Sequence, residues 1–74
     1  MRLNVKCFAT LAEKSPPGGV CELPEGADAA RLMLTLGVPA AEVKLIFING
    51  VAAEPAAVLH DGDRVGLFPA VGGG

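Results

Sequence analysis

The sequence predicts an α+β domain in which one main helix packs on one face of a mixed sheet of four or five strands. Short apolar runs typical of β-strands lie near both ends of the chain, and a single helical pattern lies between them. Turn signals rich in glycine and proline separate these segments. A chain of 74 residues can bury one small core, so we expect residues 1–74 to form a single domain.

The first predicted strand runs from Arg2 to Ala9, because apolar and polar residues alternate along it with the period of a half-buried strand. Phe8 breaks the pattern, since it falls on the polar side. A turn-rich segment at 15–19 follows, and Val20 to Leu23 is expected to pair back on the first strand as a hairpin.

The helix is predicted directly after Asp28, whose side chain can accept hydrogen bonds from the first turn. Gly37 suits the left-handed residue that ends a helix, and a further helical turn is expected at 40–42. The buried face is formed by apolar residues at helical spacing, namely Ala29, Leu32, Met33 and Leu36.

The remaining strands are predicted at 45–48, 51–54 and 64–68. Asn49-Gly50 is a strong signal for a two-residue hairpin turn between the first two of them. Residues 60–63 form a second turn in which Gly62 supplies a positive φ, so Asp61 and Asp63 are read as turn residues and His60 as a solvated one.

One helix cannot cover both faces of such a sheet, so the second face is left to water or to a partner. The element order is that of a ubiquitin-like β-grasp, in which the first and last strands are neighbours. In that case Phe8 and Phe68 both stand on the helix-free face and form an apolar patch of the kind that marks interfaces. The alternative is that one ring only covers the edge of the core.

Composition excludes several classes of function. Six basic and eight acidic residues give a net charge of −2, which argues against nucleic-acid binding. No apolar stretch is long enough to span a bilayer, so we expect a cytoplasmic protein. Cys7 and Cys21 show neither a disulfide framework nor a metal-ligand spacing, and we expect both thiols to be buried core groups rather than a sulfur relay.

The chain closes on Gly72, Gly73 and Gly74, directly after an apolar strand. Glycine adds no side chain to a core and loses much freedom when ordered, so residues 70–74 are expected to form a flexible tail. Such a tail can present its terminal carboxylate to another protein. The alternative is a frayed or truncated terminus.

Residues 59–74 resemble the closing pattern L-x-D-G-D-x-V-x-L-F-P-P-V-x-G-G of the MoaD/ThiS family of sulfur carriers. The resemblance extends to 8–13 after the first strand, to 26–28 before the helix and to 48–50 at the hairpin. It is closest to the small subunit of molybdopterin synthase. Ala12 and Ala70 depart from the pattern, where an arginine and a second proline are common.

The resemblance implies a function for the diglycine Gly73-Gly74. A ubiquitin-activating-type adenylyltransferase of the MoeB/ThiF kind would use ATP to adenylate the Gly74 carboxylate, which then becomes a thiocarboxylate. The tail would deliver this sulfur inside the MoaE-like large subunit of molybdopterin synthase. The chain itself would be no enzyme and would bind no cofactor or metal. The partner-binding residues implied are Phe8, Val51, Phe68, Pro69, Val71 and Gly72.

Three other functions remain open at the level of sequence. The chain could carry sulfur for another pathway, such as formation of the thiamine thiazole. It could be a protein modifier whose Gly74 forms isopeptide bonds with lysines. It could also be a ubiquitin-like interaction module with an inert tail.

Overall fold

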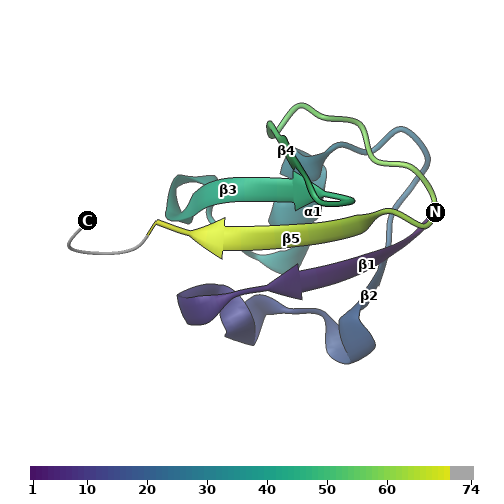
Figure 1. The fold of residues 1–74 in the computed structure, drawn as a ribbon. Coiled ribbons are helices and arrows are strands. Elements are labelled where there is room, and N and C mark those ends of the chain that lie inside the picture. Colours follow the sequence, from purple (N-terminus) through teal and green to yellow (C-terminus); the bar gives the residue numbers. More distant parts are fainter. Residues whose placement is uncertain (71–74) are drawn as a thin grey trace.

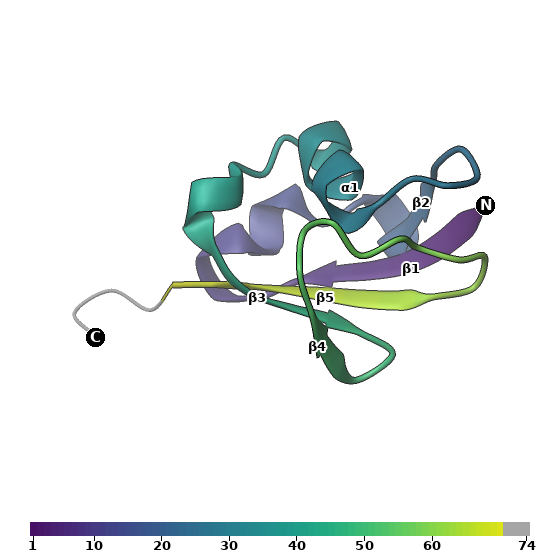
Figure 2. The same cartoon turned by 90° about the horizontal axis from the view of Figure 1, so that it is seen from above.

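The computed structural model describes residues 1–70, which form one five-stranded sheet with one α-helix across one of its faces (Figures 1 and 2). The strand order is β2-β1-β5-β3-β4. The first and last strands, β1 and β5, lie side by side and run parallel, while the other neighbours are antiparallel. This confirms the expected pairing. The strands are β1 Arg2–Cys7, β2 Val20–Glu22, β3 Val43–Ile48, β4 Val51–Ala53 and β5 Arg64–Pro69.

The helix α1 spans Ala29–Leu36, as predicted. It begins where Asp28 accepts a hydrogen bond of 2.9 Å from the backbone N–H of Arg31, which satisfies a donor of the first turn. It ends at Gly37, whose φ of 74° is the left-handed conformation that glycine adopts most easily. Figure 2 shows that α1 lies on one side of the sheet.

Three short 3-10 helices complete the chain: η1 at Ala9–Lys14, η2 at Pro17–Gly19 and η3 at Ala40–Glu42. The prediction that the first strand continues to Ala9 is wrong, because the strand ends at Cys7. Ala9 has a left-handed φ of 52°, and this turn starts η1, which the sequence did not predict. The reason is packing, since the turn brings Leu11 into the core with 2% of its surface exposed.

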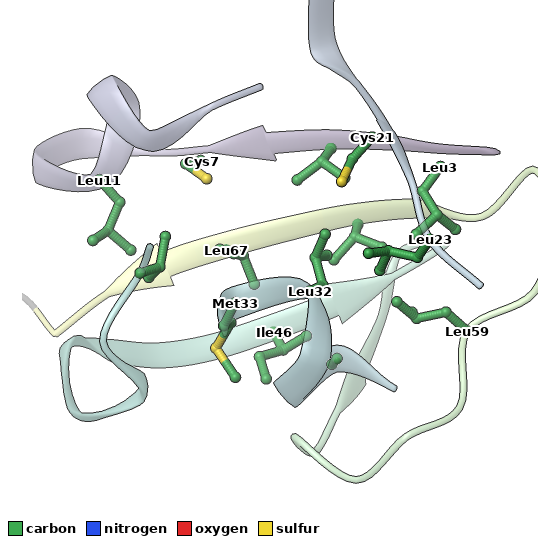
Figure 3. Close-up of a cluster of buried hydrophobic side chains, with 14 residues drawn as sticks. Leu3, Cys7, Leu11, Cys21, Leu23, Leu32, Met33, Ile46, Leu59 and Leu67 are labelled. Carbon is green, nitrogen blue, oxygen red and sulfur yellow. The ribbon is translucent and has the colours of Figure 1, made fainter. Parts of the chain in front are cut away.

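The core lies between α1 and the face of the sheet that α1 covers (Figure 3). Every second side chain of β1 and β5 points toward α1, and among these Leu3 and Leu67 are fully buried. Leu32 of α1 packs against them and is also fully buried. Full burial of one such side chain contributes about 1.5–3 kcal/mol. The largest fully buried residues are Leu3, Leu32, Met33, Leu59 and Leu67, and all are aliphatic.

The hairpin between β3 and β4 has the predicted two-residue turn, in which Asn49 and Gly50 both have positive φ, 52° and 81°. Ile48 then pairs with Val51. This turn twists in the same sense as the strands it joins. It therefore helps to fix which residues of β3 face the helix and which face away.

Candidate functional site

The face of the sheet opposite α1, here called the open face, carries all three phenylalanines of the chain. Val65 and Leu67 of β5 are buried beneath the helix. Side chains alternate along a strand, so Phe68 and the position of Gly66 lie on the open face. Phe47 is on the same face, because it pairs directly with Gly66. A sheet with one covered face commonly leaves the other face for water or a partner.

The rings of Phe8 and Phe68 form a parallel stack, with centroids 4.1 Å apart and an angle of 5° between their planes. Phe47 meets Phe68 edge to face, with centroids 5.4 Å apart. Both arrangements are favourable contacts for aromatic rings. The expected meeting of Phe8 and Phe68 on the helix-free face is thus confirmed, and we call this pair the aromatic stack.

The rings of Phe8 and Phe68 lie over Gly66. A Cβ atom built on Gly66 would lie 3.4 Å from both Phe8 and Phe68, so the two rings fold over a position that has no side chain. The three phenylalanine side chains are only half-buried. Aromatic surface of this kind, held in one geometry and still accessible, is typical of the anchors of protein interfaces.

The aromatic stack lies at the end of the sheet where β5 finishes. The backbone N–H of Phe8 donates to the carbonyl oxygen of Leu67 at 3.0 Å, which joins the two segments just past the end of β1. The N–H of Ala70 donates to the carbonyl oxygen of Glu42 at 3.2 Å. A protein that covers the stack would therefore also lie beside Ala70, the last described residue.

The other residues predicted to bind a partner are not gathered at the stack. Val51 is 68% exposed, but its pairing with Ile48 gives it the opposite facing from Phe47. Pro69 is half-buried at the end of β5 and pairs with Val43. Their roles stay predictions. Val71, Gly72, Gly73 and Gly74 lie outside the described residues.

Sequence reasoning missed two members of the open face, Phe47 and Leu45. Leu45 pairs with Phe68 and is 45% exposed. Both belong to a continuous apolar run, which does not by itself say which residues face the helix. The pairing of this run with β5 would have shown which of its residues lie on the open face, but the sequence does not reveal that pairing.

The two turns that carried much of the resemblance meet at the opposite end of β5. The Asp63 carboxylate accepts hydrogen bonds from the His60 backbone N–H at 2.8 Å and from the Asn49 side chain at 2.9 Å. These two bonds hold the pKa of Asp63 below its usual value. Asn49 also accepts from the Arg64 N–H at 2.9 Å. The turn residues therefore fix the start of β5, as their turn chemistry predicted.

Cys7 and Cys21 are buried free thiols of the core, as expected. Burial raises the pKa of both thiols, and for Cys7 a hydrogen bond from Ser15 opposes the rise in part. A raised pKa means less thiolate at neutral pH, and the thiolate is the reactive form. Neither group thus has the environment of a reactive cysteine.

Among residues 1–70, no group of three or more His, Cys, Asp or Glu side chains is arranged to hold a metal ion. Within the same range, no helix has the length and apolar character needed to cross a membrane.

The sheet order, the single helix and the open aromatic face define a ubiquitin-like β-grasp protein. A family comparison agrees with this class, since the model of the ThiS family matches residues 5–74. The chain belongs to the ThiS family. Members of this family are small sulfur carriers that work with an adenylyltransferase and partner enzymes and are not themselves catalytic. The comparison with curated proteins found no match.

Solved structures confirm the fold over almost the whole chain. A putative molybdopterin converting factor, subunit 1, from Pyrococcus furiosus is 28% identical with a TM-score of 0.73, covering 96% of this chain and 99% of that one. SAMP1 from Haloferax volcanii is 24% identical with a TM-score of 0.72 and full coverage of both chains. A structure of H. volcanii small archaeal modifier protein 1 is 21% identical with a TM-score of 0.73, covering 95% and 98%.

Proposed function

We propose that this chain carries sulfur as a thiocarboxylate on Gly74 and donates it in molybdopterin or tungsten-pterin biosynthesis. The observation that carries the proposal is the position of the aromatic stack beside Ala70. A partner that binds Phe8 and Phe68 there would lie within a few residues of the diglycine. The family match through residue 74 supports the same reading, and the Pyrococcus furiosus structure favours the molybdopterin branch.

The proposed chemistry has two steps. A Gly74 carboxylate oxygen attacks the α-phosphorus of ATP in the partner adenylyltransferase, and pyrophosphate leaves. A hydrosulfide ion then attacks the carbonyl carbon of the acyl adenylate, AMP leaves, and loss of the S–H proton gives the thiocarboxylate. The first step is needed because a resonance-stabilised carboxylate has no good leaving group. In this proposal the partners supply catalysis and bind ATP, and the chain supplies a tethered, positioned substrate.

The role of the open face in this proposal is docking. Phe8 and Phe68 would anchor the adenylyltransferase first and the large synthase subunit afterwards, with Pro69 at the margin of the contact. Aromatic side chains held in a fixed geometry lose little conformational freedom when a partner covers them. The same surface can therefore serve partners that bind in succession.

The test is incubation of the full chain with the adenylyltransferase of the same organism, ATP and a sulfide donor, followed by intact mass spectrometry. We expect one C-terminal oxygen to be replaced by sulfur. Deletion of Gly74 is expected to abolish the change and to leave the thermal unfolding midpoint unaltered. An unchanged mass for the wild type contradicts the proposal, and a ladder of protein conjugates would instead identify a modifier.

A second measurement addresses the pathway. The thiocarboxylated chain is mixed with the large subunit of molybdopterin synthase and its pterin precursor. Sulfur transfer to the pterin is the expected result. Transfer only in a reconstituted thiazole-forming system would assign the carrier to thiamine synthesis instead.

A further inference from the structure

The open face carries two cations, Lys6 beside the aromatic stack and Arg64 at the start of β5. Lys6 pairs with Gly66 and Arg64 pairs with Asn4, so both basic residues belong to the two central strands, β1 and β5. Strand alternation gives them the same facing as the rings. The Lys6 ammonium lies 5.2 Å from the centroid of the Phe8 ring, within the range of a cation–π contact. Charge and aromatic surface are therefore adjacent.

A shallow groove of about 550 Å³ lies between these two cations, and Lys6 borders both this groove and the aromatic stack. Lys6 and Arg64 line one side of it, and the loop that contains Ser15 and Pro16 lines the other. Gly18 and Gly19 also line the groove. A side chain from another protein can enter this space and reach both cations.

The charges of this groove are not balanced from within the described chain. Among residues 1–70 the one contact within ion-pair distance joins His60 and Asp63, so neither Lys6 nor Arg64 forms an ion pair with an acidic side chain there. Asp63 directly precedes Arg64, but its carboxylate accepts hydrogen bonds from His60 and Asn49 instead. The whole chain has a net charge of −2, so this local positive charge opposes the overall sign. Opposite charges placed across an interface guide association and select partners.

We propose that the protein that docks on the open face presents acidic side chains to the Lys6–Arg64 groove, next to an apolar group that covers the aromatic stack. This inference rests on the proposed function, because the docking protein is the adenylyltransferase of that scheme. It specifies which groups of the partner make the contact. Carboxylates of the partner bind in the groove, and an apolar side chain of the partner packs on Phe8 and Phe68. A nucleic acid fits poorly, since two cations on an acidic chain neutralise few phosphates.

The inference predicts how association depends on salt and on charge. Attraction between exposed charges more than about 10 Å apart is largely screened at 0.1 M salt. Reversing one groove cation should therefore slow association most at low ionic strength. Dissociation should change less, because contacts at the margin of an interface act mainly on the association rate.

The experiment compares Lys6→Glu and Arg64→Glu with Arg31→Glu as the matched control. Arg31 lies on α1, on the other side of the sheet, and its reversal changes the net charge by the same amount. Glutamate is also well tolerated in the first turn of a helix. Arg64 has no recorded contact with the rings, so its variant tests charge separately from the cation–π contact of Lys6.

Association of the full chain with the adenylyltransferase is measured by biolayer interferometry at 50 and 200 mM NaCl. We expect each groove variant to associate at least about tenfold more slowly at 50 mM and to lose most of the salt dependence. Arg31→Glu should differ from wild type by less than about twofold. Equal slowing by all three variants, or no slowing by the groove variants, overturns the inference.

Thiocarboxylation of the wild type, measured in the same preparations, separates the two proposals. If the wild type gains sulfur but the groove variants associate normally, the inference fails and the sulfur-carrier function stands. If the groove variants associate slowly but the wild type never gains sulfur, the acidic docking partner stands and the proposed function fails. Thermal melts of each variant check that the fold is retained.

Discussion

The two faces of the sheet carry apolar side chains of different kinds. The covered face is aliphatic, and Leu3 and Leu67 are fully buried beneath α1. The open face carries the three phenylalanines, which are half-buried and pack on one another. A small domain has little surplus stability, so the first face must supply it. The open face is then available to bind a partner. Two neighbouring residues of β5 thus have different roles, because Leu67 stabilises the core and Phe68 lies on the open face.

The largest effect is expected from truncation on the covered face. Leu67→Ala removes a fully buried side chain and leaves a cavity, which should lower the free energy of unfolding by about 2–5 kcal/mol. Urea unfolding followed by circular dichroism measures this loss. If Phe68→Ala, one residue further along β5, lowered the free energy of unfolding as much as Leu67→Ala, the two faces would not differ in their contribution to stability.

The second effect concerns binding at the open face. Phe68→Ala removes the ring that contacts both Phe8 and Phe47, so affinity for the adenylyltransferase should fall by about 2 kcal/mol or more, roughly 30-fold. Isothermal titration calorimetry measures the affinity. Val58→Ala, an exposed apolar residue in the connection between β4 and β5, serves as the control and should change it little. Equal weakening by both variants would mean that the stack is not an anchor.

Much of this division between faces could be predicted from the sequence. Alternation identified Leu3 as buried and placed Phe8 in the opposite phase, and the helix was bounded correctly by its Asp28 cap and Gly37. These are local signals, because a strand has a period of two and a cap acts within one turn. The end of the first strand was predicted wrongly, since the left-handed turn at Ala9 goes with the burial of Leu11 in a core built from distant segments.

What the sequence did not predict depends on pairing between distant strands. The contact of Phe47 with Phe68 follows from the register of β3 against β5, and the groove of Lys6 and Arg64 follows from the register of β1 against β5. Register is a property of two segments at once, so no window along one strand reveals it. The role of Gly66 is of the same kind, because the rings that cover it come from two strands.

The third effect tests what holds that register. Asp63 joins the turn before β5 to the hairpin turn of β3 and β4, and a slip of one residue would exchange the two faces of β5. Asp63→Ala should lower the free energy of unfolding by about 0.5–1.5 kcal/mol, because it removes two solvent-exposed hydrogen bonds that join the turns. Chemical denaturation of both proteins at neutral pH measures the difference.

The contribution of Asp63 should also depend on pH. Its pKa is lowered in the folded state, so the stabilisation is complete above the usual aspartate pKa of about 3.9 and is lost as pH falls through that value toward the folded-state pKa. The stability of Asp63→Asn should therefore fall less steeply below about pH 4 than that of the wild type. Parallel curves for the two proteins would contradict a role for the ionised carboxylate.

The smallest effect is expected at Gly66, where the open face can be altered without touching the core. A Cβ atom there lies at ordinary contact distance, 3.4 Å, from both rings, and φ is not in the left-handed region. Gly66→Ala should thus keep the stack and raise stability by about 0.4–1 kcal/mol, because alanine reduces the freedom of the unfolded chain. Gly66→Val adds two methyl groups beneath the rings and should separate them. Ring-current shifts of the Phe8 and Phe68 protons in NMR spectra report the stack directly, and their loss in the alanine variant would mean that the stack requires a residue without a side chain at position 66.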